Sequence, residues 1–194
     1  MVEEMTNGKC LYWVDLETTG LDEEKCSILE VSVFEAKFMD PFNAKQLYHS
    51  EVYLPYVPDC PEAKLDPFVI NMHTKNGLFT ECRAWPKPRD IDEIEEDLLE
   101  LIPQVQSKEM MPHLAGSSIH FDAKFINKHM PTLARRFSHR HYDVSALKLF
   151  CQSKGMPEFK KSEAHRATAD ILESIEHAKQ CDVWLSAQPR RTWT

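Results

Sequence analysis

Asp15 and Glu17 stand at the end of the apolar run 10–14, and their types and spacing could hold a metal ion. Strand side chains alternate between the two faces of a sheet, so these two carboxylates are expected to project from one face. Carboxylates placed side by side at the end of a buried strand repel each other and lose hydration. A divalent cation relieves both effects, and hard oxygen ligands favour Mg²⁺ or Mn²⁺. The alternative is a strand that surfaces and ends in the polar turn 18–22.

Of three further aspartates, two are expected where the sheet meets its helices and the third within the last helix. Asp122 lies one turn into a helix expected after 116–119, where an acid also stabilises a helix N-terminus without any metal. Asp143 lies at a strand-to-helix junction and is expected to be an N-cap. Asp170 lies on or beside the apolar stripe of the last helix, where an unpaired charge is costly, so it requires a partner or a metal.

His165 precedes Asp170 by five positions. Five residues turn an α-helix by roughly 500°, so the two side chains would not share one helical face. This spacing predicts that His165 lies on the entering loop or in the first turn, able to swing over a site that Asp170 helps to build. Most of the nine histidines are expected to be structural or merely exposed.

The composition is that of an ordinary globular domain, with 194 residues, 42% hydrophobic and 28% charged,. No apolar run approaches membrane-spanning length, and the acidic start does not resemble a signal peptide, so an intracellular, cytoplasmic protein with no membrane partner is expected. The six scattered cysteines are expected to be buried thiols in a reducing compartment,. The net charge of −8 argues at first against a nucleic-acid ligand, because phosphate binding usually requires a basic surface,. The segment 124–166, however, has ten Lys or Arg against three acids, which suits a short anionic ligand.

The elements that must position these residues follow from periodicity and turn chemistry. Strands are expected over 9–17, 27–34, 45–54, 111–115 and 139–142. Helices are expected over 66–72, from 90 along a stripe that reaches Val105, after 116–118, over 144–153, and from near Ser162 to the C-terminal region,. Three leading strands followed by alternating helices and strands predict an α/β fold with a mixed central sheet. The expected organisation is a flexible leader (1–9), one domain (10–185) and a tail (186–194).

The order Asp15-x-Glu17, Gly116-Ser-Ser-Ile-x-x-Asp122, His165-x-x-x-x-Asp170 resembles the DEDDh group of 3′→5′ exonucleases. The match is closer still to oligoribonucleases, through the stretches 13–22, 72–78 and 140–148, and it covers nearly the whole chain. The resemblance implies an RNase H-like exonuclease fold and two Mg²⁺ or Mn²⁺ ions that clamp the attacking water and the leaving oxygen of a phosphodiester. It implies that the metals are held by Asp15, Glu17, Asp122 and Asp170. It also implies that His165 is the general base.

The resemblance further implies a set of substrate-binding residues. Leu21 and Phe68 would sandwich the bases, although an aromatic residue on a short helix such as Phe68 could equally pack into the core. His73 belongs to the matching 72–78 stretch and is assigned to substrate binding. Ser118, Arg140 and Ser145 would close on the 5′-phosphate. The implied function is metal-dependent 3′→5′ cleavage of short oligoribonucleotides to mononucleotides. The implied partner is short single-stranded RNA, with DNA as the alternative, and the implied assembly is a homodimer.

Some positions depart from the family pattern. Phe68 stands where the family commonly has Trp, Ala146 where it often has Thr, and His139 and His141 where dimeric members have tyrosines. Gly116-Ser117 replaces the usual Gly-Asn, and the stretch 39–45 is insertion-like. Two alternatives therefore stay open: a general exonuclease of the same group that trims longer RNA or DNA, and a catalytically dead binding module. The complete set of four acids and His165 argues against the second.

Overall fold

The computed structural model describes residues 8–57, 65–159 and 165–188. A five-stranded sheet with the order β3-β2-β1-β4-β5 forms its centre. The strands are β1 (Cys10–Thr18), β2 (Ile28–Lys37), β3 (Asp40–Glu51), β4 (His113–Gly116) and β5 (Tyr142–Asp143). The first three pair antiparallel, whereas β4 pairs parallel with β1 and β5 pairs parallel with β4. The expected α/β fold with a mixed sheet is therefore confirmed.

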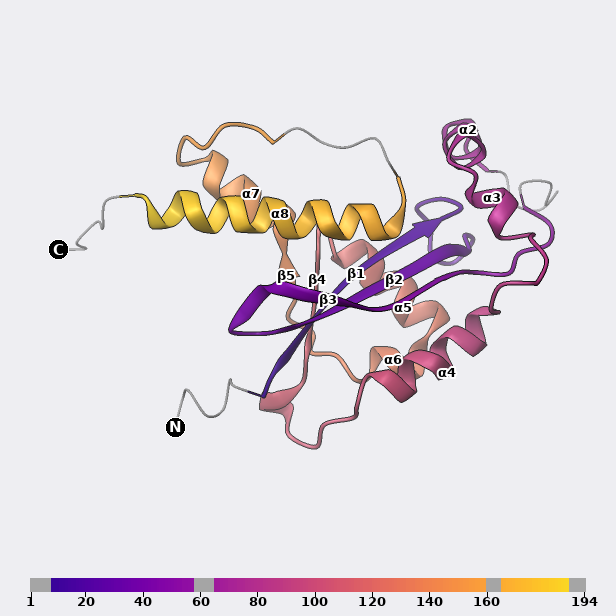
Figure 1. Cartoon of the computed structure of the whole chain (residues 1–194), viewed down its shortest axis with the longest axis horizontal. Helices are drawn as coiled ribbons and strands as arrows, with labels where there is room; N and C mark the ends of the chain where they lie inside the picture. Colours follow the sequence, from indigo (N-terminus) through magenta and orange to yellow (C-terminus); the bar gives the residue numbers. More distant parts are fainter. Residues whose placement is uncertain (1–7, 58–64, 160–164, 189–194) are drawn as a thin grey trace.

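Helices cover both faces of this sheet (Figure 1). They are α2 (Pro67–Lys75), α3 (Leu78–Glu81), α4 (Ile91–Leu101), α5 (His120–His129), α6 (Pro131–Ala134), α7 (Val144–Gln152) and α8 (Ala167–Ser186), with a short 3-10 turn, η1 (Lys108–Met110). No helix within the described ranges is long and apolar enough to cross a membrane.

The central strand β1 is buried on both faces, which explains its nearly continuous apolar sequence,. Tyr12, Val14 and Leu16 pack in a cluster with residues of α4, α5 and α6. Leu11 and Trp13 belong to a second cluster with residues of α7 and α8. Because strand side chains alternate, Asp15 and Glu17 share the face of Leu11 and Trp13 and look towards α8.

Short local signals define several helix starts as expected. Asp66 caps α2 by accepting a hydrogen bond from the Phe68 backbone N–H at 2.8 Å, with Pro67 as the first helical residue,. Asp143 caps α7, accepting from the Ser145 N–H at 2.8 Å, which confirms its predicted role.

Two predicted boundaries were wrong by several residues. The last helix begins at Ala167 rather than near Ser162, because Arg166 is held in an extended conformation by ion pairs described below. The third strand covers Asp40–Glu51 rather than 45–54, so most of the apparent insertion 39–45 is strand. Pro41 suggests a loop in the sequence, but β3 is an edge strand, where proline is tolerated,. Its carbonyl even accepts a hydrogen bond from the Trp13 indole at 2.9 Å.

Smaller differences concern element ends and short helices. The strands β4 and β5 are shorter and end later than predicted, and α4 ends at Leu101, so Val105 is not on its stripe. The helices α3 and α6 were not predicted, since four residues are too few for a helical period to be recognised,. The leader (1–7), part of the loop 56–67 (58–64), residues 160–164 and most of the tail (189–194) lie outside the described residues.

Candidate active site

Three carboxylates converge on the face of β1 that looks towards α8. Asp15 and Glu17 come from β1 and Asp170 from the first turn of α8, and each offers an oxygen within 4.8 Å of the others. Glu17 is buried, whereas the other two residues are half-buried. The sequence prediction that the first two residues share a face is confirmed, and residues more than 150 positions apart meet in one cluster.

Mutual repulsion and loss of water disfavour the charged forms of these acids. Burial, and then the nearby Asp122, Glu17 and Asp170, raise the pKa of Asp15 well above its usual value. Burial, together with Asp170 and Glu30, raises the pKa of Glu17 to about 8. A cluster of this kind fits a divalent cation, because the donors are all carboxylate oxygens and a bound cation removes the repulsion.

The fourth predicted acid, Asp122, lies beside this cluster. It is buried at the start of α5, and its Oδ1 accepts a hydrogen bond from the Leu16 backbone N–H at 2.9 Å. Burial raises its pKa to about 7. Asp122 is close enough to raise the pKa of Asp15. The Asp122 carboxylate therefore points from α5 to the end of β1, next to the three converging carboxylates.

A close approach of β4 to β1 places the residues before Asp122. A Cβ at Gly116 would lie 2.8 Å from the Val14 carbonyl oxygen, so no larger residue fits there. Ser118 follows with φ of 55°, a left-handed conformation that is strained for a residue other than glycine,. The Ser118 hydroxyl lies 3.0 Å from that of Ser145, and its N–H donates to Asp143 at 3.1 Å. Two residues of the predicted phosphate-binding set are thus in direct contact.

His165 lies on the segment that enters α8, as predicted. Its φ is 46°, also left-handed, and its carbonyl accepts a hydrogen bond from the Asn76 side chain at 2.7 Å. The Phe68 ring stands edge-on to the His165 ring at a centroid distance of 6.5 Å. His165 is therefore held beside α2 and immediately before the helix that supplies Asp170.

Leu21 and Phe68 are exposed, at 82% and 65% respectively. The interpretation of Phe68 as a core residue is thereby excluded, and both side chains are free to meet a ligand from solvent. His73 differs, because it is fully buried on α2 with its Nε2 3.7 Å from Glu17 Oε2. Burial lowers the pKa of His73 to about 4, so it is neutral near pH 7. The His73 ring therefore lies next to the Glu17 carboxylate, on the side of α2.

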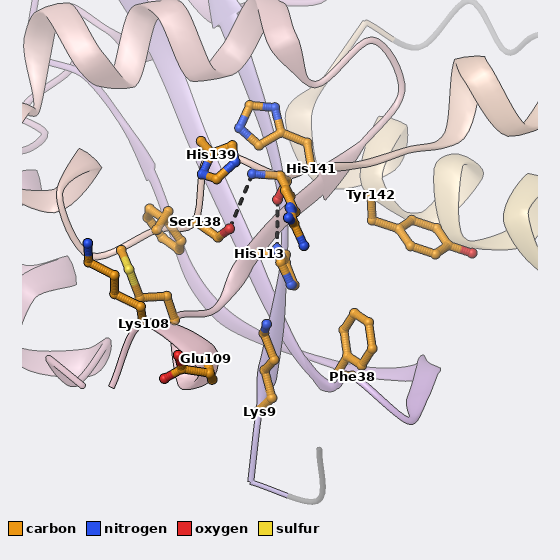
Figure 2. Close-up of a pocket in the computed structure, with 12 residues that line it drawn as sticks. Lys9, Phe38, Lys108, Glu109, His113, Ser138, His139, His141 and Tyr142 are labelled. Atoms are coloured by element: carbon orange, nitrogen blue, oxygen red, sulfur yellow. Dashed lines mark hydrogen bonds between the residues drawn. The ribbon is translucent and has the colours of Figure 1, made fainter. Parts of the chain in front are cut away.

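Arg140 lies in a different place from the other predicted substrate residues. With Lys9, Lys108 and His113 it lines a pocket of about 960 Å³, shown in Figure 2. Its carbonyl oxygen lies 2.7 Å from His113 Nδ1. This pocket is at the start of β1, and six residues at about 3.3 Å each put Lys9 roughly 20 Å from Asp15 along the strand. Within one chain, Arg140 and the acid cluster are well separated.

Sequence reasoning missed an ion-pair network behind the acid cluster. Glu30 is the partner of Glu17 in the register of β1 and β2. Its carboxylate forms an ion pair with the Arg166 guanidinium at 3.0 Å and accepts a hydrogen bond from the Ala167 N–H at 2.9 Å. Arg166 also contacts Glu81 at 2.7 Å and Glu51 at 3.5 Å. The side chains of Glu30, Glu51 and His49 are spaced like metal ligands, but the Arg166 guanidinium already pairs with Glu30 and Glu51. In the sequence, this network is indicated only by the position of Arg166 next to His165.

Comparisons with known proteins agree with this geometry. A family model described as exonuclease matches residues 12–177. An oligoribonuclease of Francisella tularensis is 32% identical over 90% of this chain and 95% of its own length. One from Neisseria meningitidis serogroup B is 34% identical over 90% of this chain and 91% of its own length.

Among solved structures, the zinc-bound complex of E. coli exonuclease I with single-stranded DNA aligns with a TM-score of 0.66 and 16% identity. A product-bound structure of exonuclease I aligns with a TM-score of 0.62 and 13% identity. These alignments cover 92% of this chain but only 41% and 45% of the exonuclease I chains. At such identity they establish a shared fold, and they confirm the predicted RNase H-like architecture.

Proposed function

Because the chain belongs to the exonuclease family and oligoribonucleases are among its relatives, we propose that it cleaves short single-stranded oligoribonucleotides from the 3′ end to mononucleotides. The observation that supports this most directly is the convergence of Asp15, Glu17 and Asp170 within 4.8 Å. Carboxylates gathered at such a cost in repulsion suit a phosphodiesterase that works with divalent cations.

We propose Asp15, Glu17, Asp122 and Asp170 as the residues that hold two Mg²⁺ or Mn²⁺ ions. When bound, such ions activate water and stabilise the leaving oxygen of the phosphodiester. The neutral His73 behind Glu17 fits this assignment, because it adds no positive charge that would compete with a cation. Asp122 would be fixed in orientation by the Leu16 N–H.

His165 is proposed as the general base. A neutral imidazole can accept a proton from water. The left-handed backbone places His165 outside α8, so its ring is not restricted to the helical face of Asp170. Its protonated form would then return the proton to solvent.

Base recognition is proposed for Leu21 and Phe68, whose exposed side chains lie on segments flanking the site. Stacking on such side chains is worth about 1–3 kcal/mol per base and does not depend on base identity. Ser118 and Ser145 are proposed to bind a terminal phosphate. The preference for RNA over DNA is part of the proposal.

Arg140 lies in the pocket at the start of β1, level with Leu11 in the strand register and about 13 Å before Asp15 along β1,. We therefore propose a homodimer in which Arg140 serves the partner's site. We also propose an intracellular, cytoplasmic location, which is supported by the free thiols of all five described cysteines,.

The test is a time course on 5′-labelled RNAs of graded length, with Mg²⁺, Mn²⁺ or EDTA. We expect stepwise release from the 3′ end, no cleavage in EDTA, and faster cleavage of 5′-phosphorylated RNAs of two to four residues than of a twenty-residue RNA. Equal rates on short and long RNAs would favour the general exonuclease. Binding without cleavage under every condition would favour the binding module.

A further inference from the structure

Among the described residues, the side chain of Asn76 anchors the His165 backbone to the end of α2. This residue follows α2 as its C-cap. Its Nδ2 donates to the His165 carbonyl at 2.7 Å, while its Oδ1 accepts from the Leu78 N–H at 3.1 Å. One half-buried amide thus connects the start of α3 with a residue 89 positions away.

His165 needs an anchor because its own backbone and that of Arg166 are not helical. A φ of 46° is sparsely populated by residues with a Cβ, and such a conformation persists only where the surroundings hold it,. The next residue, Arg166, is extended, with φ −135° and ψ 128°, and it is fixed from its own side by Glu30 and Glu81. Asn76 is the side chain that holds the His165 peptide itself.

The direction of the His165 side chain depends on this peptide. In the left-handed conformation Cβ leaves the backbone in a direction that an extended or helical residue would not give. If the carbonyl were released, the residue could relax towards an ordinary conformation and the ring would move away from its present place. Phe68 lies on α2, the helix that Asn76 caps, and its ring stands edge-on to the His165 ring with 6.5 Å between the ring centroids. The helix α2 therefore meets both the ring and the carbonyl of His165.

We propose that Asn76 is a positioning residue that holds His165 in the conformation required for proton transfer, through its hydrogen bond to the His165 carbonyl. This inference rests on the proposed role of His165 as general base. It assigns to the α2–α3 junction a part in catalysis, although Asn76 itself contacts no reacting atom. Misplacement of a catalytic group by about 1 Å can cost on the order of 10²-fold in rate.

The competing explanation is that Asn76 only stabilises the α2–α3 junction through Leu78. The variant Asn76→Asp separates the two roles, because a carboxylate can still accept from the Leu78 N–H but cannot donate to the His165 carbonyl. Asn76→Ala removes both interactions. A matched control is Asn43→Ala, which removes a side-chain hydrogen bond of 3.2 Å to Asp40 on the edge strand β3.

The experiment measures kcat, KM and Mn²⁺ affinity on a 5′-phosphorylated dinucleotide, in the parent and in a His165→Ala background. We expect Asn76→Asp and Asn76→Ala to lower kcat by about 10- to 100-fold, with KM and Mn²⁺ affinity within about threefold of the parent. In the His165→Ala background the same substitutions should change kcat by less than about twofold, because residues that act as a unit are not additive. Asn43→Ala should match the parent.

Three results would overturn the inference: parental kcat in Asn76→Asp, an equal loss of kcat with and without His165, or a loss of Mn²⁺ affinity that parallels the loss of rate. If Asn76→Ala fails to fold, Asn76→Asp, which keeps the interaction with Leu78, decides. The two hypotheses fail differently. A parental rate in His165→Ala removes the general base and this inference together, whereas a slow His165→Ala with fast Asn76 variants removes only the inference.

Discussion

In the metal-free chain, the charged forms of the acids at the site are unfavourable. The effect of each acid can be measured by replacing one residue at a time. Burial is the first cause that raises the pKa values of Asp15, Glu17 and Asp122, and neighbouring acids raise them further, whereas backbone hydrogen bonds lower the pKa of Asp122. The proposed catalysis uses their negative charge to hold metal ions, whereas that charge opposes folding of the metal-free chain. Substitutions should therefore separate catalysis from stability.

Replacing one acid of the cluster should abolish cleavage without harming the fold. We expect Asp15→Ala or Asp170→Asn to lose detectable exonuclease activity, and the thermal midpoint in EDTA to stay equal or rise, since one source of repulsion is removed. Activity on a labelled dinucleotide and thermal melts with and without Mn²⁺ measure the two effects. A variant as fast as the parent would contradict the two-metal assignment.

The metal-free protein should lose stability as the pH rises through neutrality. The pKa of Glu17 is about 8 in the folded chain, against an ordinary 4.5. A carboxyl group with a raised folded pKa contributes stability that is complete below its unfolded pKa and is lost as the pH passes its folded pKa. Melts in EDTA between pH 4.5 and 8 should show this decline, and Glu17→Gln should reduce its slope. A slope unchanged in Glu17→Gln would show that other groups cause it.

At the scale of elements, the site is assembled by linking α8 to β2. The carboxylate of Glu30, 1% exposed, receives the Arg166 guanidinium and the first N–H of α8. Burial alone would raise the pKa of Glu30, but hydrogen bonds from His49, Arg166 and the Ala167 N–H outweigh it and lower the pKa to about 2. The start of α8, and with it Asp170, is placed by this pair.

Breaking the pair should destabilise the fold as well as the site. Arg166→Ala leaves the buried Glu30 carboxylate without its main partner, which costs about 3 kcal/mol for a buried pair. Urea denaturation measures the loss, with Arg135→Ala, an exposed residue of the same type, as control.

The contribution of Glu30 also has a predictable pH dependence. Its folded pKa is lowered, so its stabilisation is present above about 4.5 and is lost as the pH falls towards 2,. Urea titrations of the parent and of Glu30→Gln across that range should converge at low pH. Parallel curves would mean that Glu30 does not cause the acid sensitivity.

At the scale of the whole molecule, the two ends of β1 carry different chemistry. The acid cluster lies at its C-terminal half, and the pocket with Lys9, Lys108 and Arg140 lies at its start. Within one chain the two groups are separated, with Lys9 roughly 20 Å and Arg140, level with Leu11 in the strand register, about 13 Å from Asp15 along β1,. A homodimer that brings one end of β1 against the other would join them.

Subunit mixing tests this arrangement. On a 5′-phosphorylated dinucleotide, Asp15→Ala homodimers should be inactive and Arg140→Ala homodimers should be weakly active. After unfolding and refolding together, heterodimers should regain activity, because the site with an intact Asp15 receives Arg140 from the other subunit. Sedimentation measures the oligomeric state in parallel. A monomer in solution, or mixtures no more active than their components, would contradict the shared site.

The sequence alone determined the α/β fold, the central apolar strand and the shared face of Asp15 and Glu17, because these follow from local periodicity and from the alternation of strand side chains. It also determined the helix start at Asp66 and the cap Asp143, because the interactions there span two residues. The exonuclease family followed from motifs in order along the chain and was confirmed by the comparisons.

Only the tertiary structure decided how distant residues meet. The start of α8 at Ala167 depends on Arg166 binding Glu30, which is 136 positions earlier, and no local pattern records such a contact. The choice between core and surface for Phe68, the burial of His73 behind Glu17, and the distance of Arg140 from the acids depend on which elements pack together. Periodicity describes one element at a time, whereas these features arise where several elements converge.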